Sequence, residues 1–282
     1  MIDTQGDLRG ACSVITGGAS GIGKALAREL VRRGGRVALA DISLDEATAT
    51  ADEIGSGARA YQCDVTSRKK VLQISDKIER DLGPVNLVFA NAGVFVEAKL
   101  QEMAPDEFDW LFDVNVKGVF NIIQAFTTHL LKHASRGDLA RFVLTGSESS
   151  VGLPSQGVMT AYTATKHAVL GIADGLRRDL DETGVGVSIL CPGPVITRIW
   201  DARRSRQARH GGPAAAEPKT ADAAQRIFAS IGQDPDVTAR LCLDGVSRDE
   251  FMIVTDPKIR SYAARRHAEV DAALDLLDRP IA

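Results

Sequence analysis

Short apolar runs alternate with longer amphipathic segments along the first two-thirds of the chain. The runs, rich in β-branched residues, lie at 12–16, 36–40, 58–63, 85–90, 141–145 and 185–191. Between them, apolar residues recur every three or four positions over lengths that are typical of helices. Runs that are apolar throughout are typical of strands buried on both faces. The pattern therefore predicts six strands joined by crossover helices.

Regular alternation of strand and helix predicts an α/β fold, in which a parallel sheet carries helices on both faces. Right-handed crossovers make such a sheet doubly wound, and its ligands then bind at the carboxyl ends of the strands. Ser43 with Glu46 forms a capping-box signature before one helix, and Ser67 is placed to cap the next. A late apolar run at 251–256, "FMIVTD", adds a seventh strand.

The pattern changes after Thr197. Residues 198–219, "RIWDARRSRQARHGGPAAAEPK", are rich in Arg, Ala, Gly and Pro and predict a polar helix followed by a loop. Residues 258–277 predict a terminal helix, one face of which is expected to pack on the body. The apolar positions of that face are Val270, Ala273, Leu274 and Leu277.

Composition and charge narrow the class of protein. Apolar residues make up 44% and charged residues 25%, with a net charge of −3, so nothing indicates a nucleic-acid or membrane partner. The apolar runs are too short to span a bilayer, and the N-terminus "MIDTQGDLRG" is too polar for a signal peptide. Four scattered cysteines without a C-x-x-C are typical of reduced, buried thiols. We expect a soluble cytoplasmic protein of one domain, 1–282.

The first strand ends in "TGGASGIGKALAREL", which places Gly17, Gly21 and Gly23 at a strand-to-helix turn. Such glycines permit a tight turn and let a pyrophosphate approach the N-terminus of the helix. A plain glycine turn is the alternative for an isolated match. Its position at the first strand–helix junction favours a dinucleotide site.

The second strand ends at Asp41, eighteen residues after Gly23. A carboxylate there can accept hydrogen bonds from an adenosine ribose and repels a 2′-phosphate. Positions 20 and 42, where a phosphate clamp is expected, hold Ser20 and Ile42 instead of Arg or Lys. This favours NAD over NADP.

The stretch "TAYTATKHAVLG" places Tyr162 and Lys166 four residues apart on a predicted helix. Four residues return nearly to the same helix face, so the phenol and the ammonium are neighbours. They form either a surface pair or a tyrosine whose pKa is lowered by a cation, which is then able to exchange protons near neutral pH.

Taken in order, the motifs "TGGASGIG", "NAG" at 91–93, Asn115, the serines after the fifth strand, "YTATK" and "PGPVIT" resemble the short-chain dehydrogenase/reductase family. The resemblance covers residues 8 to about 198. It implies a Rossmann-type sheet and hydride transfer between NAD(H) and a secondary alcohol or ketone. The cofactor-binding residues it implies are Gly17, Ser20, Gly21, Ile22, Gly23, Asp41, Asp64, Val65, Asn91, Ala92, Gly93, Tyr162, Lys166, Pro192, Gly193, Val195 and Thr197.

The same resemblance implies the catalytic roles. Tyr162 is the general acid/base, and Lys166 lowers its pKa and binds the nicotinamide ribose. Asn115 interrupts its helix and holds a water that relays protons. The family's serine stands thirteen residues before the tyrosine, which indicates Ser149 for holding the substrate oxygen. Counting from the strand indicates Ser147, which stays the alternative.

The segment after Thr197 departs from the family's usual ending. We therefore divide the chain into a core at 8–198, a substrate lid at 199–250, and a last strand and helix at 251–282. The expected lining is mostly apolar and favours an apolar alcohol or ketone as substrate. Its residues are Val94, Phe95, Met159, Ile199 and Trp200. A homodimer or homotetramer is expected, although the altered ending leaves open which.

Two further signals are interpreted as structural. His129 and His133 lie at i and i+4, but no third ligand is evident, so we expect a helix-surface pair and no metal site. A cluster of arginines after Thr197 is interpreted as a solvated helix face, and the alternative is a binding site for an anionic substrate. Its members are Arg198, Arg203, Arg204, Arg206 and Arg209.

Two other classes of function are weighed against the dehydrogenase. One is a protein that senses NAD without turnover; the other is a cofactor-free lyase on the same scaffold. The halohydrin dehalogenases are such lyases, and they carry arginine at the lysine position and lose the glycine motif. Tyr162, Lys166 and the intact glycines argue against both classes.

Overall fold

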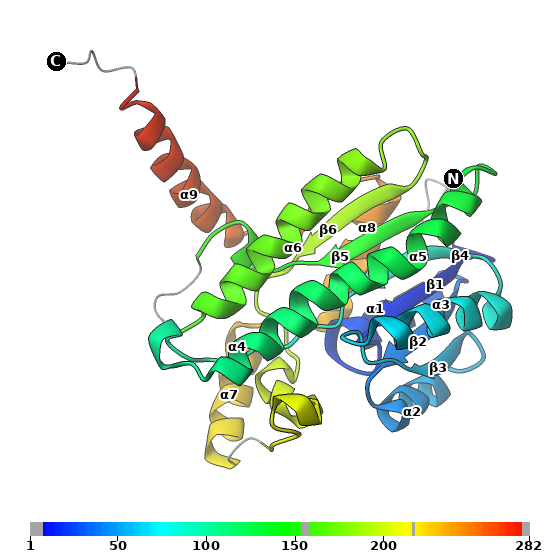
Figure 1. The fold of residues 1–282 in the computed structure, drawn as a ribbon, viewed down its shortest axis with the longest axis horizontal. Helices are drawn as coiled ribbons and strands as arrows, with labels where there is room; N and C mark the ends of the chain where they lie inside the picture. The colour runs from blue at the N-terminus through cyan, green and yellow to red at the C-terminus, as the bar shows by residue number, and fades with distance from the viewer. Residues whose placement is uncertain (1–7, 154–157, 216–217, 278–282) are drawn as a thin grey trace.

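The computed structural model describes residues 8–153, 158–215 and 218–277. The polar N-terminus at 1–7 and the last five residues of the expected terminal segment lie outside that range. One parallel sheet runs through the described residues in the order β3-β2-β1-β4-β5-β6-β7 (Figure 1). Its strands are β1 (Cys12–Thr16), β2 (Arg36–Asp41), β3 (Ala58–Gln62), β4 (Val85–Ala90), β5 (Arg141–Thr145), β6 (Gly186–Cys191) and β7 (Met252–Val254). The predicted doubly wound, Rossmann-type fold is confirmed.

Helices cover both faces of the sheet, which explains why the strands are apolar throughout. One apolar core lies between the sheet and the helices α1 (Gly21–Arg32), α2 (Leu44–Ile54) and α8 (Pro235–Ser247). A second core lies under α3 (Arg68–Leu82), α5 (Gly118–Ala134) and α6 (Thr160–Asp179). Strand side chains on both faces are therefore removed from water.

The helix starts follow the sequence only in part. The Ser43 hydroxyl accepts the backbone N–H of Glu46 at 3.3 Å at the start of α2, as expected. Ser67 occupies the N-cap of α3 but makes no capping hydrogen bond to the described chain through its side chain. Asp64 instead organises this turn, because its Oδ1 accepts the N–H and the hydroxyl of Thr66 at 3.0 and 2.6 Å.

The arginine-rich segment 198–210 differs from the expected polar helix. It forms two short 3₁₀ turns, η4 (Ile199–Ser205) and η5 (Ala208–His210). Its side chains are held by α4 (Pro105–Phe112) and by the residue that follows α4. Arg203 pairs with Glu107, and Arg209 with Asp113, at 2.7 Å in each case. The backbone conformation of the segment is therefore determined by these long-range ion pairs and not by helical periodicity. The helix α7 (Pro218–Ile231) follows, and α8 then packs on α1.

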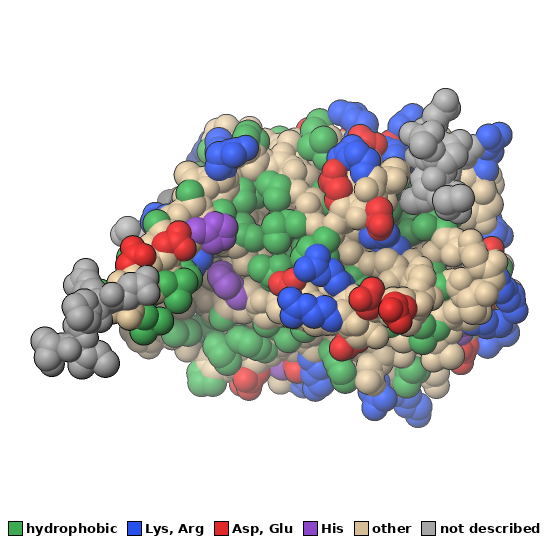
Figure 2. All heavy atoms as spheres, turned by 90° about the horizontal axis from the view of Figure 1, so that it is seen from above, with side chains coloured by type: hydrophobic (Ala, Val, Ile, Leu, Met, Phe, Trp, Pro, Cys, Tyr) green, Lys and Arg blue, Asp and Glu red, His purple; other side chains and the backbone are tan. Residues whose placement is uncertain are grey.

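The terminal helix α9 (Ile259–Leu274) forms as predicted, but the prediction that it packs on the body is wrong. Within α9 the buried residue is Ile259, whereas Val270 and Leu274 are 49% and 54% exposed. Figure 1 shows α9 leading away from the sheet, and Figure 2 shows hydrophobic side chains at the surface of that arm. Helical spacing identifies an apolar stripe, but it does not specify what covers the stripe.

The four cysteines are buried and free, as expected. In the part of the chain that the structure describes, no helix is both long enough and apolar enough to cross a membrane.

Candidate active site

A cavity of about 1030 Å³ lies at the carboxyl ends of the central strands. Gly17 follows β1, Asp41 ends β2, Asn91 follows β4 and Ser147 follows β5; all four line the cavity. This is the edge at which a doubly wound sheet binds its ligands, near the point where the strand order reverses.

Most of the residues expected to bind a cofactor line this cavity. They are Gly17, Ser20, Ile22, Asp41, Asp64, Val65, Asn91, Ala92, Gly93, Tyr162, Lys166, Pro192, Gly193, Val195 and Thr197. Gly21 and Gly23 lie behind them in the turn. A Cβ on Gly23 would stand 2.1 Å from the carbonyl oxygen of Gly17, and one on Gly21 would stand 3.0 Å from Thr197. The glycines therefore let the turn and the helix approach closely.

The N-terminus of α1 suits a dinucleotide's pyrophosphate. Ser20 is the N-cap residue of this helix, and within the described chain its side chain makes no capping hydrogen bond to the helix N-terminus. By sequence the first turn contains no acidic residue. Its backbone N–H groups and the positive end of the helix dipole are favourable for an anion.

Asp41 faces the cavity with a carboxylate that the backbone already fixes. Its Oδ2 accepts the N–H of Ala19 and its Oδ1 that of Ser43, both at 3.1 Å. Burial raises the pKa of Asp41, while these two hydrogen bonds act in the opposite direction. The carboxylate is thus oriented toward the place expected for an adenosine ribose.

A member of the arginine cluster, Arg204, lies close to this place. The Nη2 of Arg204 is 3.5 Å from the Ser20 hydroxyl, although the two are far apart in sequence. Positions 20 and 42 themselves hold no cation, but the fold brings Arg204 to Ser20 from segment 198–210. The arginine cluster was the only signal, and its placement depends on the path of segment 198–210.

A second contact ties the same segment to the β3 end. Gln207 donates from Nε2 to Asp64 Oδ1 at 2.9 Å, and Trp110 donates from Nε1 to Gln207 Oε1 at 2.9 Å. By the family resemblance, Asp64 is expected to border an adenine ring. Segment 198–210 therefore bridges the adenosine end of the cavity and α4.

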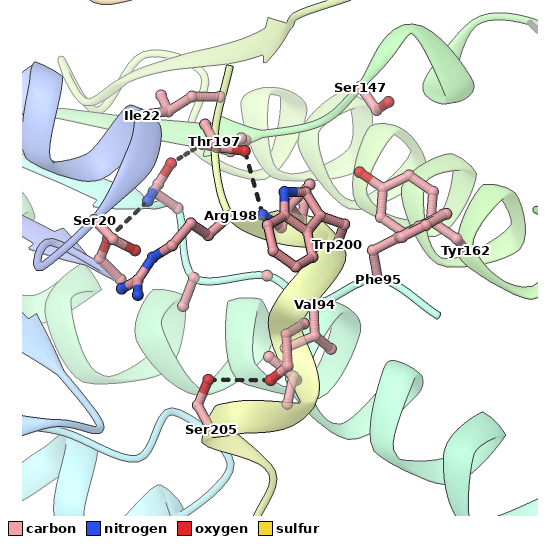
Figure 3. Close-up of a pocket in the computed structure, with 18 of the residues that line it drawn as sticks. Ser20, Ile22, Val94, Phe95, Ser147, Tyr162, Thr197, Arg198, Trp200 and Ser205 are labelled. Carbon is pink, nitrogen blue, oxygen red and sulfur yellow. Dashed lines mark hydrogen bonds between the residues drawn. The ribbon is translucent and has the colours of Figure 1, made fainter. Parts of the chain in front are cut away.

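The loop after β5 places the two candidate serines differently. Ser147 lines the cavity, and Figure 3 shows it beside the hydroxyl end of Tyr162. Hydrogen bonding by Ser147 lowers the pKa of Tyr162. Ser149 is 0% exposed, and its hydroxyl has no partner in the described chain. The turn η3 (Glu148–Ser150) has Ser147 at its N-cap and directs Ser149 into the interior. The structure thus brings Ser147, the alternative, to the cavity and leaves Ser149 buried in the turn.

Tyr162 lies in the first turn of α6 and packs against Phe95 edge to face, with ring centroids 5.2 Å apart. Burial raises the pKa of Tyr162 to about 12; the hydrogen bond from Ser147 lowers it, and the charge of Glu148 raises it further. The lowering of this pKa, which the resemblance implies for the cofactor complex, stays a prediction. Burial outweighs the favourable contacts that the chain itself provides.

Lys166 follows one turn later on the same face. Its Nζ lies 5.7 Å from the centroid of the Tyr162 ring and donates to the carbonyl of Thr145 at 2.8 Å. Burial lowers the pKa of Lys166 to about 8. The two side chains are thus neighbours inside the cavity, and the alternative of a surface pair is excluded.

Asn115 interrupts its helix, as expected. It lies in a π-helical turn, η2 (Asp113–Lys117), between α4 and α5. Its Oδ1 accepts the N–H of Val94 at 2.8 Å, and its Nδ2 donates to the Val94 carbonyl at 2.9 Å. A Cβ on Gly93 would stand 3.5 Å from both Asn115 Oδ1 and Lys166 Nζ. The amide therefore lies near the lysine but outside the cavity lining.

The apolar side of the cavity agrees with the sequence. All five expected lining residues are present: Val94, Phe95, Met159, Ile199 and Trp200. Figure 3 shows the indole of Trp200 reaching from η4 toward Phe95 and Tyr162. Sequence reasoning missed Glu148 and Tyr262, which also line the cavity, because neither belongs to a motif.

The two histidines His129 and His133 pair with a glutamate on a neighbouring helix. His133 is 1% exposed, and its Nε2 lies 3.1 Å from Glu79 Oε1 on α3; His129 pairs with the same carboxylate. In the described residues no group of histidine, cysteine or acidic side chains could hold a metal ion. The expectation of a surface pair is therefore wrong for His133, because its partner lies on another helix.

The doubly wound sheet, the glycine turn and the tyrosine–lysine pair in one cavity define a dinucleotide-dependent oxidoreductase. The family model for short chain dehydrogenase matches residues 11–208, and the chain belongs to that family. Its members use a nicotinamide cofactor.

Known relatives extend over most of the chain. It is 31% identical to a sorbitol dehydrogenase of Cereibacter sphaeroides, over 82% of this chain and 88% of the relative. It is 34% identical to a 1-deoxy-11-beta-hydroxypentalenate dehydrogenase of Streptomyces avermitilis, over 80% and 83% of the two chains. A short-chain dehydrogenase from Burkholderia phymatum, solved in complex with NAD, superposes with a TM-score of 0.84 at 29% identity over 98% of both chains.

Proposed function

We propose that the chain is an NAD-dependent dehydrogenase that interconverts a secondary alcohol and its ketone. The observation that carries the proposal is that Ser147, Tyr162 and Lys166 line one cavity, with Lys166 Nζ 5.7 Å from the centroid of the Tyr162 ring. Ketone reduction needs a proton donor and a dipole that holds the oxygen where charge develops. Tyr162 and Ser147 provide these two groups.

Each residue has a distinct role in the proposed reaction. Ser147 donates a hydrogen bond to the substrate oxygen, and Tyr162 takes the hydroxyl proton of an alcohol or returns it to a ketone. When bound, the nicotinamide supplies the hydride donor or acceptor and, in its oxidised form, a positive charge. Lys166, whose pKa is lowered to about 8, can pass a proton onward and hydrogen-bond the nicotinamide ribose. Asn115 fixes the loop at Val94 beside it and supports the relay.

The cofactor-binding proposal assigns three contacts. The turn at Gly17 and the N-terminus of α1 would receive the pyrophosphate, and Asp41 would accept the ribose hydroxyls. Asn91 would lie beside the adenosine ribose; Thr16 and Thr145 hold its side chain, with Nδ2 2.9 Å from the Thr16 carbonyl oxygen. Support for NAD comes from Asp41 and from the NAD complex of the Burkholderia relative. Arg204 is the feature that would favour NADP.

The substrate is proposed to be a small alcohol or ketone. The two curated relatives are named dehydrogenases of a sugar alcohol and of a hydroxylated carboxylate. In this chain the apolar wall would hold the carbon skeleton, and segment 198–210 would serve as its lid. We also propose a homodimer or homotetramer, to be tested by light scattering after gel filtration.

The decisive test is turnover. The purified protein is incubated with a panel of secondary alcohols and NAD at alkaline pH, and NADH formation is followed by absorbance. NADH binding without turnover of any alcohol, or of the matching ketones with NADH, would favour a sensing protein instead. Release of halide from a halohydrin without cofactor would favour the lyase class.

A further inference from the structure

Glu148 is a buried acid at the centre of the proposed site to which no motif gives a role. It stands between the two serines, it is 9% exposed, and it lines the cavity. Its backbone N–H donates to the Pro192 carbonyl at 2.7 Å, which anchors the turn η3 to the end of β6. The position of Glu148 is therefore fixed by the loop that places Ser147.

The carboxylate of Glu148 accepts no hydrogen bond from the described part of the chain. Burial raises its pKa to about 7; the nearby charge of Asp256 raises it further, and that of Lys258 lowers it. Its own charge in turn raises the pKa of Tyr162. Glu148 is thus close enough to the proposed catalytic hydroxyl for the two to face the same ligand.

The segment after β7 closes this end of the cavity. Asp256 packs so tightly on Gly193 that a Cβ there would stand 2.5 Å from its Oδ2. Tyr262, in the first turn of α9, lines the cavity and packs on Gly152, where a Cβ would stand 2.6 Å from the tyrosine's own Cβ. The charged or titratable groups around Glu148 are therefore Asp256, Lys258, Tyr162 and Tyr262.

A buried carboxylate without a hydrogen-bond donor is costly, and a ligand that supplies the donor removes that cost. The cavity lining also includes the rings of Phe95 and Trp200, which are apolar apart from the indole N–H. A ligand in the cavity can therefore meet both these rings and the acid Glu148.

We propose that Glu148 is a substrate-recognition residue, which accepts a hydrogen bond from a hydroxyl or protonated amino group on a carbon near the reacting one. This inference rests on the proposed function and narrows its substrate class to diols, polyols or amino alcohols. It replaces the expectation of an apolar alcohol or ketone by one of a substrate with a second polar group.

The test compares 2-butanol, 2,3-butanediol, 1,3-butanediol and 3-amino-2-butanol as substrates of the wild type, Glu148→Gln and Glu148→Leu. We expect the wild type to prefer at least one bifunctional compound, by kcat/KM, over 2-butanol. Glu148→Leu removes the acceptor and is expected to lower that preference about tenfold, mainly through KM. Glu148→Gln keeps an acceptor oxygen but has no charge. The preference for the amino alcohol should therefore fall in both variants, whereas the preference for a diol should fall mainly in Glu148→Leu.

Glu102→Gln serves as the matched control, because this glutamate is 60% exposed and lies outside the cavity lining. An unchanged preference in Glu148→Leu would overturn the inference while leaving the proposed function intact. If the wild type oxidises none of the four compounds, the proposed function fails for this class. Thermal shifts with the same compounds and NADH need no turnover, and equal shifts for the wild type and Glu148→Leu would then overturn the subsite.

Discussion

Gln207 of segment 198–210 donates a hydrogen bond to Asp64 at the end of β3, at 2.9 Å. The same amide accepts the indole N–H of Trp110, which is fully buried. One side chain therefore holds the segment to the adenosine end of the cavity and to α4 together.

Replacing Gln207 by leucine is expected to loosen the segment. Two hydrogen bonds are lost and a buried indole N–H is left unpaired, which costs roughly 1–3 kcal/mol and increases the open population about 5–150-fold. Trypsin should then cleave at Arg203 and Arg204 correspondingly faster, and the Trp110 fluorescence should shift. Gln101→Leu, at an exposed position, is the control. Equal cleavage rates in both variants would contradict a holding role for Gln207.

The two serines are expected to differ strongly in function. Ser147→Ala removes the hydroxyl that contacts Tyr162 and should lower kcat by about 10²-fold or more while NADH still binds. Ser149→Ala changes a hydroxyl that faces the interior, so its effect on kcat should be small. Steady-state kinetics and NADH fluorescence titration measure both effects. The reverse ranking would return the role to Ser149.

The pH dependence of alcohol oxidation is expected to follow the groups around Tyr162. Oxidation requires the phenolate, so kcat/KM should rise with pH. Ser147 lowers the pKa of Tyr162 and Glu148 raises it. Ser147→Ala should therefore move the profile to higher pH, and Glu148→Gln should move it to lower pH.

Tyr162→Phe should abolish turnover and leave NADH binding intact. Full activity of Tyr162→Phe on any confirmed substrate would refute the mechanism.

Cofactor choice is expected to depend on Asp41 and Arg204 in opposite ways. Asp41→Ala removes the acceptor for ribose hydroxyls, so it should weaken NADH binding and relax discrimination against NADPH. Arg204→Ala removes a cation near Ser20 and should weaken NADPH more than NADH. Dissociation constants of both cofactors for the three proteins provide the test. Tighter binding of NADPH than of NADH by the wild type would contradict the proposed NAD preference.

The exposed helix α9 is expected to contribute little to the stability of the monomer. Leu274 is 54% exposed, so Leu274→Ala should change the free energy of unfolding by less than about 0.5 kcal/mol. Leu30 on α1 is 0% exposed, and Leu30→Ala should cost about 2–5 kcal/mol. Urea unfolding at low protein concentration measures both values. A loss at Leu274 comparable to that at Leu30 would show that α9 is covered in solution.

The sequence by itself determined the elements and the local motifs. Strand runs such as 12–16 and 85–90, the glycine turn at Gly17 and the Tyr162–Lys166 spacing follow from backbone sterics and periodicity within a few residues. These features are local, so they can be predicted without knowing the contacts that distant residues make.

The tertiary structure alone decided the contacts between distant segments. It placed Arg204 beside Ser20, paired His133 with Glu79 and turned Ser147 instead of Ser149 toward Tyr162. It also left α9 exposed and surrounded Glu148 with the residues after β7. Each of these depends on which elements lie side by side and on how much water they exclude. Burial and long-range charge are properties of that three-dimensional arrangement, and residue spacing along the chain does not encode them.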